Sequence, residues 1–501
     1  MVPGEHCRAL AGQSGAEASC SLASTTGFYT PSEKAKRFRT ERIRYWDSYE
    51  RRPAGRYYHE QLTRIYQFLV PPGRRVLELG CGSGDLLAAL RPSHGVGLDF
   101  SPRMIAQAAR RRPELHFVLA DVHQLALRGK FDYVILSDLI NDLWDVQTCI
   151  EQVASVCSAD TRIIINSYSR LWETPLWAVR RLGLANPLIA QNWLTVEDIE
   201  NLLYLTGFES IRSWHEILLP IGIPLLDSIA NSYLARLFPF QYAALTNFVI
   251  ARPAPRVSAS KPEPLVSVII PARNEAGNIP EIIRRVPEMG AGTELIFVEG
   301  NSSDDTYQAI EHAIAANPHR KSRLFKQTGK GKGDAVRMGF AAAEGEILMI
   351  LDADMTMPPE DLPRFYAALQ SGKGEFINGA RLVYPMEQQA MRFFNLVANK
   401  FFSICFSWLL GQPLKDTLCG TKVLRRSDYE AIAANRHYFG DFDPYGDFDL
   451  LLGAAKLNLK FVDIPMRYAE RTYGETNIAR WRGGWILLRM MLFGLRRLKF
   501  Y

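Results

Sequence analysis

The chain has 501 residues, of which 47% are hydrophobic and 22% charged, and its formal net charge is +6 at pH 7. This length exceeds what one hydrophobic core organises, so we expect two or three domains, and the charge is too small to indicate a nucleic-acid partner. Seven scattered cysteines without a Cys-x-x-Cys pair speak against a disulfide framework and a structural zinc site, and favour a reducing compartment. No apolar run is long enough to predict a membrane-spanning helix.

Residues 1–30 are rich in alanine, serine and glycine, and we expect them to be a disordered leader. Residues 31–52 are basic and helix-permissive, and a helix over residues 58–69 stops at a Pro-Pro-Gly turn. Strands and helices then alternate as far as residue 252, which predicts an α/β domain with a parallel, doubly wound sheet. Its strands are expected at residues 75–79, 95–99, 116–120, 131–137, 162–167 and 248–251.

A glycine-rich turn follows the first of these strands, with Glu78 before it and Gly80, Gly82 and Gly84 inside it. Glycines let the backbone approach a ligand closely where a strand turns into a helix. Asp85 stands where the dinucleotide fingerprint needs its third glycine, so NAD is disfavoured. Acids also end the next two strands, at Asp99 and Asp121.

This pattern resembles the class I S-adenosylmethionine-dependent methyltransferases over roughly residues 40–253. The resemblance implies that S-adenosylmethionine is the cofactor and that the glycine turn passes its methionine part. Asp99 would bind the ribose hydroxyls and Asp121 the adenine amino group. The alternative is a non-binding scaffold of the same fold.

The methyl acceptor is not readable from the sequence. Asp138 and Asn141 follow the fourth strand and could face the acceptor or serve as loop caps. Residues 171–242 are rich in leucine, proline and tryptophan and are expected to form a lid over the acceptor. Residues 253–264 hold four prolines and read as a linker before a second domain over residues 265–501.

In the second domain, polar residues again follow buried strands. The strand over residues 265–271 leads into Asn274 and Glu275, and the strand over residues 294–299 ends at Glu299. A third apolar strand stops at Asp352-Ala353-Asp354. Ligands of open α/β sheets bind beyond the carboxyl ends of strands, and paired carboxylates suit Mg²⁺ or Mn²⁺, which can hold a diphosphate. The alternative is a solvated aspartate pair in a turn.

This order of motifs resembles the family 2 glycosyltransferases with the GT-A fold, and most closely the polyprenol-phosphate sugar synthases. The resemblance implies a nucleoside diphosphate sugar as donor, a metal held by Asp352 and Asp354, and inversion of the anomeric centre. Lys330 or Lys332 could reach the donor. The nucleoside would lie against Pro271, Asn274, Glu275 and Glu299.

The same resemblance implies which residues lie near the acceptor. Arg381, and with it Arg392, would lie near the acceptor phosphate, and Asp416 opens the loop that follows. Asp447 and Asp449 occupy the acidic position beside the reaction centre, and either would take the proton if the acceptor is a hydroxyl. A lipid phosphate is already ionised and needs no strong base. The loop expected to close on the phosphates contains Arg471 and Thr476, while Asn477 stands where the family has lysine.

The tail from Trp481 to Tyr501 interleaves apolar and basic residues and has no acidic ones. It is predicted to be an amphipathic helix lying on an anionic bilayer, the alternative being a core helix with a solvated basic end. We therefore expect a bifunctional enzyme, cytoplasmic and peripheral to the inner face of the membrane, that transfers a sugar to polyprenyl (undecaprenyl or dolichyl) phosphate and methylates another acceptor. The alternatives are a soluble enzyme acting on a hydroxyl-bearing glycan or small molecule, and a methyltransferase-like half that is only a scaffold.

Overall fold

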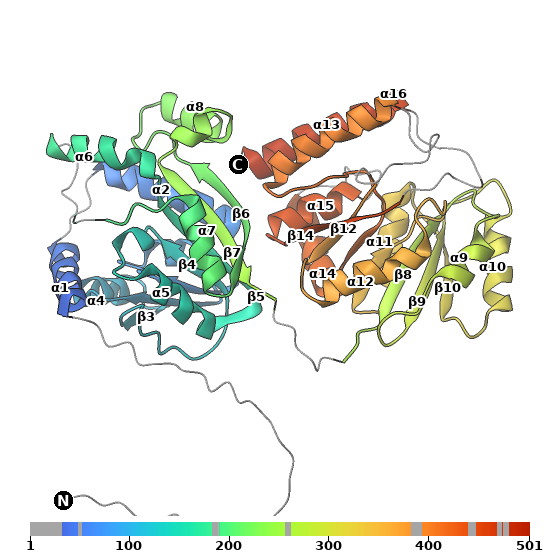
Figure 1. The fold of residues 1–501 in the computed structure, drawn as a ribbon, viewed down its shortest axis with the longest axis horizontal. Coiled ribbons are helices and arrows are strands. Elements are labelled where there is room, and N and C mark those ends of the chain that lie inside the picture. Colours follow the sequence, from blue (N-terminus) through green and yellow to red (C-terminus); the bar gives the residue numbers. More distant parts are fainter. Residues whose placement is uncertain are drawn as a thin grey trace, which may run out of the picture.

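The computed structural model describes residues 33–48, 53–182, 189, 191–255, 262–381, 393–438, 447–467, 473 and 480–500. The expected leader and residues 256–261 of the expected linker lie outside these ranges. The described elements form two α/β units, each built on its own seven-stranded sheet (Figure 1).

The first sheet has the strand order β3-β2-β1-β4-β5-β7-β6. Its strands are β1 (Arg75–Leu79), β2 (His94–Asp99), β3 (His116–Leu119), β4 (Phe131–Ser137), β5 (Cys157–Tyr168), β6 (Phe208–Glu216) and β7 (Thr246–Pro253). The helices of this unit are α1 (Glu33–Ser48), α2 (Pro53–Leu69), α3 (Asp85–Ala89), α4 (Pro102–Arg111), α5 (Val146–Val153), α6 (Glu173–Arg181), α7 (Val196–Leu205) and α8 (Leu226–Ser232). Side chains of α5 and α7 pack on one face of the sheet, and those of α2 and α3 on the other.

Two expectations for this unit need correction. The sheet is not wholly parallel, because β7 runs antiparallel to both β5 and β6. The connection from β6 to β7 stays at one end of the sheet, so β7 must run back. The segment 171–242 is not only a lid, because its residues 208–216 form the edge strand β6.

The second sheet has the order β10-β9-β8-β11-β13-β12-β14. Its strands are β8 (Val266–Ala272), β9 (Thr293–Glu299), β10 (Ser322–Lys326), β11 (Ile347–Ile350), β12 (Phe376–Ala380), β13 (Lys422–Arg425) and β14 (Phe461–Pro465). The helices are α9 (Ile279–Arg285), α10 (Thr306–Ala316), α11 (Lys332–Ala342), α12 (Leu362–Gln370), α13 (Phe393–Leu410), α14 (Arg426–Ala434), α15 (Asp447–Lys456) and α16 (Arg480–Gly494). Strands β9 and β11 are buried along their whole length, and β8 is buried at every residue but Pro271, because helices cover both faces of the sheet.

Both sheets reverse their winding at one place. Strands β2 and β3 lie on one side of β1, and β4 and β5 on the other. In the second sheet, β9 and β10 lie on one side of β8, and β11 on the other. A crevice opens beyond the carboxyl ends of strands at such a switch point. The fold therefore provides one ligand crevice between β1 and β4 and another between β8 and β11.

The two units meet across a polar contact centred on Glu375, whose side chain is only 7% exposed. Arg162 donates to both Glu375 carboxylate oxygens at 2.8 and 2.9 Å, and Arg252 Nη1 lies 3.3 Å away. Arg162 and Arg252 belong to the first unit and Glu375 to the second. Lys456 of α15 also donates to the carbonyl oxygen of Phe68, and the Phe68 ring packs against the cores of both units. These contacts fix one unit against the other.

Replacing Glu375 with alanine should weaken this contact strongly. Two buried guanidinium groups would lose a shared partner, and breaking a buried ion pair on one side costs about 3–5 kcal/mol. We expect calorimetry of the full chain to show unfolding at lower temperature. Glu360→Ala is the matched control, because Glu360 pairs with Arg285 at 2.7 Å on an exposed surface, where such pairs contribute about 0–1 kcal/mol. Equal shifts for both variants would contradict the assignment.

Candidate functional site

The glycine turn between β1 and α3 forms the first crevice. Gly80, Gly82 and Gly84 all have left-handed backbone angles, with φ values of +71°, +50° and +72°, which residues with a Cβ rarely adopt. A Cβ on Gly84 would lie 2.6 Å from the Phe117 ring, whereas a Cβ on Gly82 would meet open space. The turn therefore exposes its backbone at Gly82, where a ligand can approach.

Asp99 ties the end of β2 to this turn. Its side chain accepts hydrogen bonds from the backbone N–H groups of Gly82, at 2.9 Å, and Ser101, at 2.8 Å. Burial raises the pKa of Asp99, and these backbone hydrogen bonds work against the rise. The sequence placed Asp99 at the cofactor, and the structure places it in contact with the turn itself.

Glu78 lies just before the turn and is buried. Burial raises the pKa of Glu78 to about 8, and its Oε2 has no hydrogen-bond partner in the described part of the chain. An acid held in this way is suited to a cationic ligand, since a neighbouring positive charge favours the carboxylate form. The exposed turn and the orphaned Oε2 both fit S-adenosylmethionine, which carries positive charge.

Helix α1 contributes contacts at this crevice that the sequence did not reveal. Asp47 of α1 accepts a hydrogen bond from the Ser101 hydroxyl at 2.5 Å, and Arg39 lies 3.3 Å from Asp121. Asp121 also accepts from the backbone and ring of His123. Burial would raise the pKa of Asp121, but the His123 hydrogen bonds outweigh it and lower the pKa. The only sequence signal for α1 was its basic, helix-permissive composition.

Asp138 follows β4, directly across the switch point from the glycine turn. It has a φ of +53°, a strained value for a residue with a side chain. Its Oδ1 accepts from Tyr58, at 2.9 Å, and Asn166, at 2.6 Å, while Oδ2 is buried with no hydrogen-bond partner in the described structure. Burial raises the pKa of Asp138 to about 7. Asn141, in contrast, caps loops by bonding to the backbone of Asn192 and Tyr168.

The loops after β8 and β9 form one wall of the second crevice. Asn274 accepts from the backbone N–H of Ser303 at 2.8 Å, and Glu299 accepts from that of Ser302 at 2.6 Å. The backbone N–H of Glu275 donates to Thr306 at 2.9 Å. Pro271 belongs to β8, next to these loops. The residues expected at the nucleoside are therefore gathered in one wall, where they also hold its two loops together.

The acidic pair follows β11 on the other side of the switch point. Asp352 forms an ion pair with Lys332, the first residue of α11, at 2.5 Å. Burial would raise the pKa of Asp352, but the Lys332 ammonium outweighs it and lowers the pKa. A Cβ on Gly420 would collide with the ends of both charged side chains, so a larger residue there would push the pair apart. Lys332, rather than the exposed Lys330, is the lysine at the acidic pair.

Asp354 accepts from the backbone N–H and hydroxyl of Thr356 at 3.1 and 2.7 Å, which fixes its carboxylate. The described residues contain no group of three acidic, histidine or cysteine side chains that could hold a metal. Mg²⁺ commonly uses one or two carboxylates and takes its other ligands from water and substrate phosphates. The two carboxylates therefore fit a metal ion that is bound together with a diphosphate, and they do not fit a structural site in which the protein supplies all ligands.

The acceptor-side residues that the structure describes are engaged in ion pairs. Arg381 donates from its backbone N–H, Nε and Nη2 to Asp416, at 3.1, 2.7 and 2.9 Å, and Asp416 is fully buried. Asp449 accepts from Arg436 at 2.8 Å. Asp447 begins α15, but its side chain lies outside the described residues, as do Arg392, Arg471 and Thr476.

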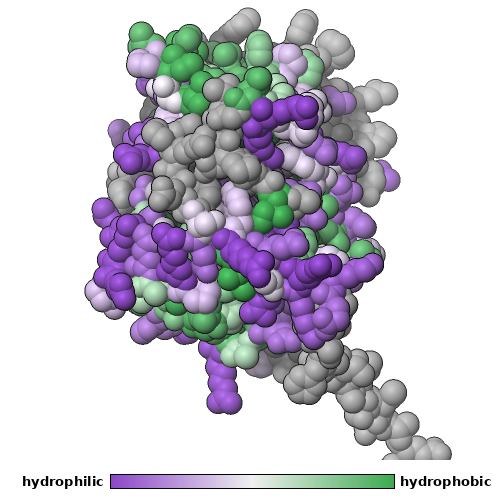
Figure 2. All heavy atoms as spheres, turned by 90° about the vertical axis from the view of Figure 1, so that its left-hand side faces the viewer, coloured by the Kyte–Doolittle hydropathy of each residue, from purple (hydrophilic) through white to green (hydrophobic). Residues whose placement is uncertain are grey.

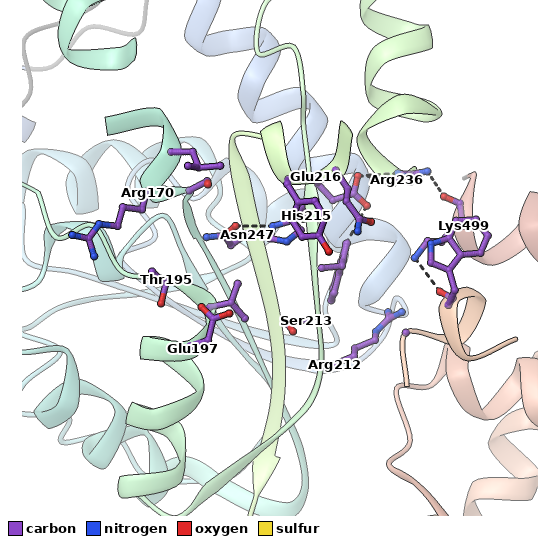
Figure 3. A pocket seen from close by; sticks show the side chains of 18 of the residues that line it. Arg170, Thr195, Glu197, Arg212, Ser213, His215, Glu216, Arg236, Asn247 and Lys499 are labelled. Atoms are coloured by element: carbon purple, nitrogen blue, oxygen red, sulfur yellow. Dashed lines mark hydrogen bonds and ion pairs between the residues drawn. The ribbon is translucent and has the colours of Figure 1, made fainter. Parts of the chain in front are cut away.

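A cavity of about 850 Å³ lies between the two units, along the edge strand β6 (Figure 3). Its walls include Arg212 and His215 of β6 and Lys499 of the second unit, and Figure 3 shows His215 bonded to Asn247 and Arg236 bonded to Glu216. Of the expected site residues that the structure describes, none lines this cavity. No helix in the described part of the chain is long and apolar enough to cross a bilayer.

Comparison with known proteins adds to this geometry. Residues 71–206 match the model of a methyltransferase domain, and residues 267–432 match that of glycosyl transferase family 2. A curated relative, the undecaprenyl-phosphate 4-deoxy-4-formamido-L-arabinose transferase of Klebsiella pneumoniae, is 26% identical over 215 residues, which are 42% of this chain and 62% of the relative. The chain thus spans less than two thirds of that relative.

Solved structures similar to the chain include the magnesium protoporphyrin IX methyltransferase of Synechocystis PCC 6803 with bound S-adenosylhomocysteine. It is 19% identical in sequence, and the TM-score is 0.30. The match covers 43% of this chain and 93% of that one. A methyltransferase of Methanosarcina mazei is 16% identical, with a TM-score of 0.30, and the match covers 38% of this chain and 97% of that one. Each family match contains the motifs of one crevice: the glycine turn lies in the first and the acidic pair in the second. The chain therefore joins a segment that matches a methyltransferase domain to a segment that matches glycosyl transferase family 2.

Proposed function

We propose that the second domain transfers a sugar, with inversion, from a nucleoside diphosphate to polyprenyl phosphate at the cytoplasmic face of a membrane. The first domain uses S-adenosylmethionine to methylate an acceptor that remains to be identified. The observation that carries the sugar-transfer proposal is the acidic pair Asp352/Asp354 at the switch point, facing the polar wall built by β8 and β9.

The proposed donor, a nucleoside diphosphate sugar, is supported by the charged groups that could hold its diphosphate. Mg²⁺ or Mn²⁺ bound through Asp352 and Asp354 would supply the positive charge that stabilises the departing diphosphate. Lys332 forms an ion pair with Asp352. Its ammonium lies where it can turn to a phosphate oxygen when the donor binds. The residues of the β8 and β9 loops then hold the nucleoside against the opposite wall.

Two observations favour a lipid phosphate over a hydroxyl as acceptor. Asp449 is engaged by Arg436, so its carboxylate is already neutralised by a cation. A phosphate acceptor is ionised at neutral pH and needs no base. The Klebsiella relative is named for undecaprenyl phosphate, which is the same class of acceptor.

On the acceptor side, we assign Asp416 to holding Arg381 in place. Both oxygens of the buried Asp416 carboxylate accept from Arg381. The guanidinium is thereby held at the end of β12, where it can contribute positive charge near the acceptor phosphate. Asp416 itself then needs no contact with the lipid.

The methyltransferase half rests on Glu78 and Asp99. Asp99 is held by the turn where the ribose hydroxyls would lie, and Glu78 offers an unbonded oxygen to the positive charge of the cofactor. Asp138 has a buried, unbonded oxygen directly across the switch point, where an acceptor would meet the cofactor. These three acids support a catalytic role for the first crevice over that of a scaffold.

Asp354→Ala should lower sugar transfer by about a thousandfold, because the diphosphate would lose several kcal/mol of charge stabilisation. The measurement is the transfer of label from a nucleotide sugar into the lipid extract of membranes that contain the full chain. Asp361→Ala, a partly exposed acid in the 3₁₀ turn before α12, is the control and should leave transfer unchanged. Full transfer by a folded Asp354→Ala variant would contradict the proposal.

Glu78→Gln should change how cofactor binding depends on pH. Glu78 has a pKa of about 8 in the free protein, so it is largely protonated at pH 7, and binding a cation should drive off its proton. In the wild type, affinity should therefore rise by up to about tenfold per pH unit between pH 6.5 and 8 relative to the variant. Titration calorimetry with S-adenosylmethionine at several pH values measures this difference.

Asp160→Asn is the control for this experiment, because Asp160 is exposed and lies outside the crevice. The same pH dependence in the wild type and in Glu78→Gln would contradict the role of Glu78. An absence of binding by the wild type would favour the scaffold alternative for the whole first domain.

A further inference from the structure

Exposed apolar side chains gather on one side of the methyltransferase domain. In Figure 2 the apolar colours lie along the top of the molecule, where Figure 1 places α6 and α8. Soluble proteins seldom leave so many large apolar groups together in water. The most exposed of these side chains are Leu225 (79%), Phe238 (77%), Leu182 (73%), Leu171 (67%), Leu226 (60%) and Trp177 (58%).

The structure holds part of this surface in a defined shape. The buried side chain of Asn231 bonds to both the backbone N–H and the carbonyl oxygen of Leu219, each at 2.8 Å, and to the Tyr57 hydroxyl of α2 at 3.2 Å. This closes residues 219–231 into a loop that is tied to α2. Leu225, at the most exposed point of the loop, has a φ of +68°, which costs backbone strain. The loop is thus built to present apolar groups outward.

The glycosyltransferase domain presents a similar surface on the same side. Helices α6, α8, α13 and α16 lie along one edge of the molecule in Figure 1. Phe401 and Ile404 of α13 are 55% and 68% exposed, and Trp485 and Leu492 of α16 are 62% and 51% exposed. Each pair is spaced so that both residues lie on one face of its helix.

Basic side chains accompany both surfaces. Arg180 and Arg181 occupy the last turn of α6, and Arg181 lies over the Trp177 ring at 5.5 Å. Arg489 of α16 and Arg496 beyond it are exposed beside Trp485 and Leu492. Acidic residues are present on the methyltransferase side too, at Glu173 and Asp227. Apolar groups with a basic rim suit the surface of an anionic bilayer.

We propose that the methyltransferase domain has its own membrane-docking face, formed by the loop 219–231, α6 and Phe238, and that this face and the α13–α16 face rest on the same anionic bilayer. A bilayer is the occupant that explains why two separate domains expose apolar groups on one common side, since a flat surface can contact both at once. The inference rests on the proposed function, because a lipid-linked acceptor requires the enzyme to work at a membrane.

The test is flotation of the full chain with vesicles of phosphatidylglycerol and phosphatidylcholine, and with phosphatidylcholine alone. The variant Ile221→Ser/Ile223→Ser/Leu225→Ser removes three exposed apolar groups of the loop and leaves Asn231 intact. We expect its bound fraction on anionic vesicles to fall at least about threefold below that of the wild type. The wild type should bind anionic vesicles more strongly than neutral ones.

The control Tyr204→Ser/Leu205→Ser removes two side chains that are 78% and 58% exposed at the end of α7, away from this face. It should bind as the wild type does. A second variant, Phe238→Ser, tests the same face outside the loop, so that misfolding of one variant does not decide the result. Wild-type binding by the triple variant and by Phe238→Ser, or equal loss in the α7 control, would overturn the proposal.

Sugar transfer to a short polyprenyl phosphate in detergent separates this inference from the proposed function. Docking variants should keep this activity, because the acidic pair is untouched. A wild type that floats with vesicles but transfers no sugar would overturn the proposed function and leave the docking face standing. A wild type that transfers sugar while the docking variants float undiminished would overturn the docking face alone.

Discussion

The arrangement of the whole molecule depends on the contact that Glu375 makes with Arg162 and Arg252. All three side chains are almost fully withdrawn from water, and buried charges are tolerated only when they are paired and hydrogen-bonded. The pairing therefore sets the orientation of one domain against the other. The placement of the two crevices, the cavity along β6 and the common apolar side all follow from that orientation.

In the second domain, the functional charged groups are paired with groups of opposite charge from the protein itself. Asp352 is paired with Lys332, Arg381 with Asp416, and Asp449 with Arg436. When a charged substrate binds, each of these side chains would exchange its protein partner for a group of the substrate. No buried charge would then be left without a partner. Glu78 uses another solution, since its raised pKa leaves it neutral until a cation comes near. The two domains thus prepare for ligands of opposite charge by different means.

Much of the fold could be predicted from the sequence, because buried strands appear as short apolar runs and the glycine turn has a distinctive spacing. The acidic pair after β11 was found for the same reason. The ion-pair partners were not, because Arg162 and Glu375 are 213 residues apart and Arg381 and Asp416 are 35 apart. The edge strand β6 was hidden in a segment whose leucine, proline and tryptophan content resembles a lid. The contribution of α1 was missed because a basic helix carries no signal for what it covers.

The dual role of Phe68 has a consequence for how the chain is made. Its ring packs against the cores of both domains. Arg162 of the first domain also pairs with Glu375 of the second, whereas Arg252 has a further partner, Glu209, within its own domain. During synthesis the amino-terminal domain emerges first, while more than a hundred residues separate Arg252 from its later partner. Until residue 375 has been synthesised, Arg162 lacks its carboxylate partner and Phe68 lacks its contacts with the second domain. The surface around Phe68 and Arg162 therefore reaches its final environment only after the second domain has folded against the first.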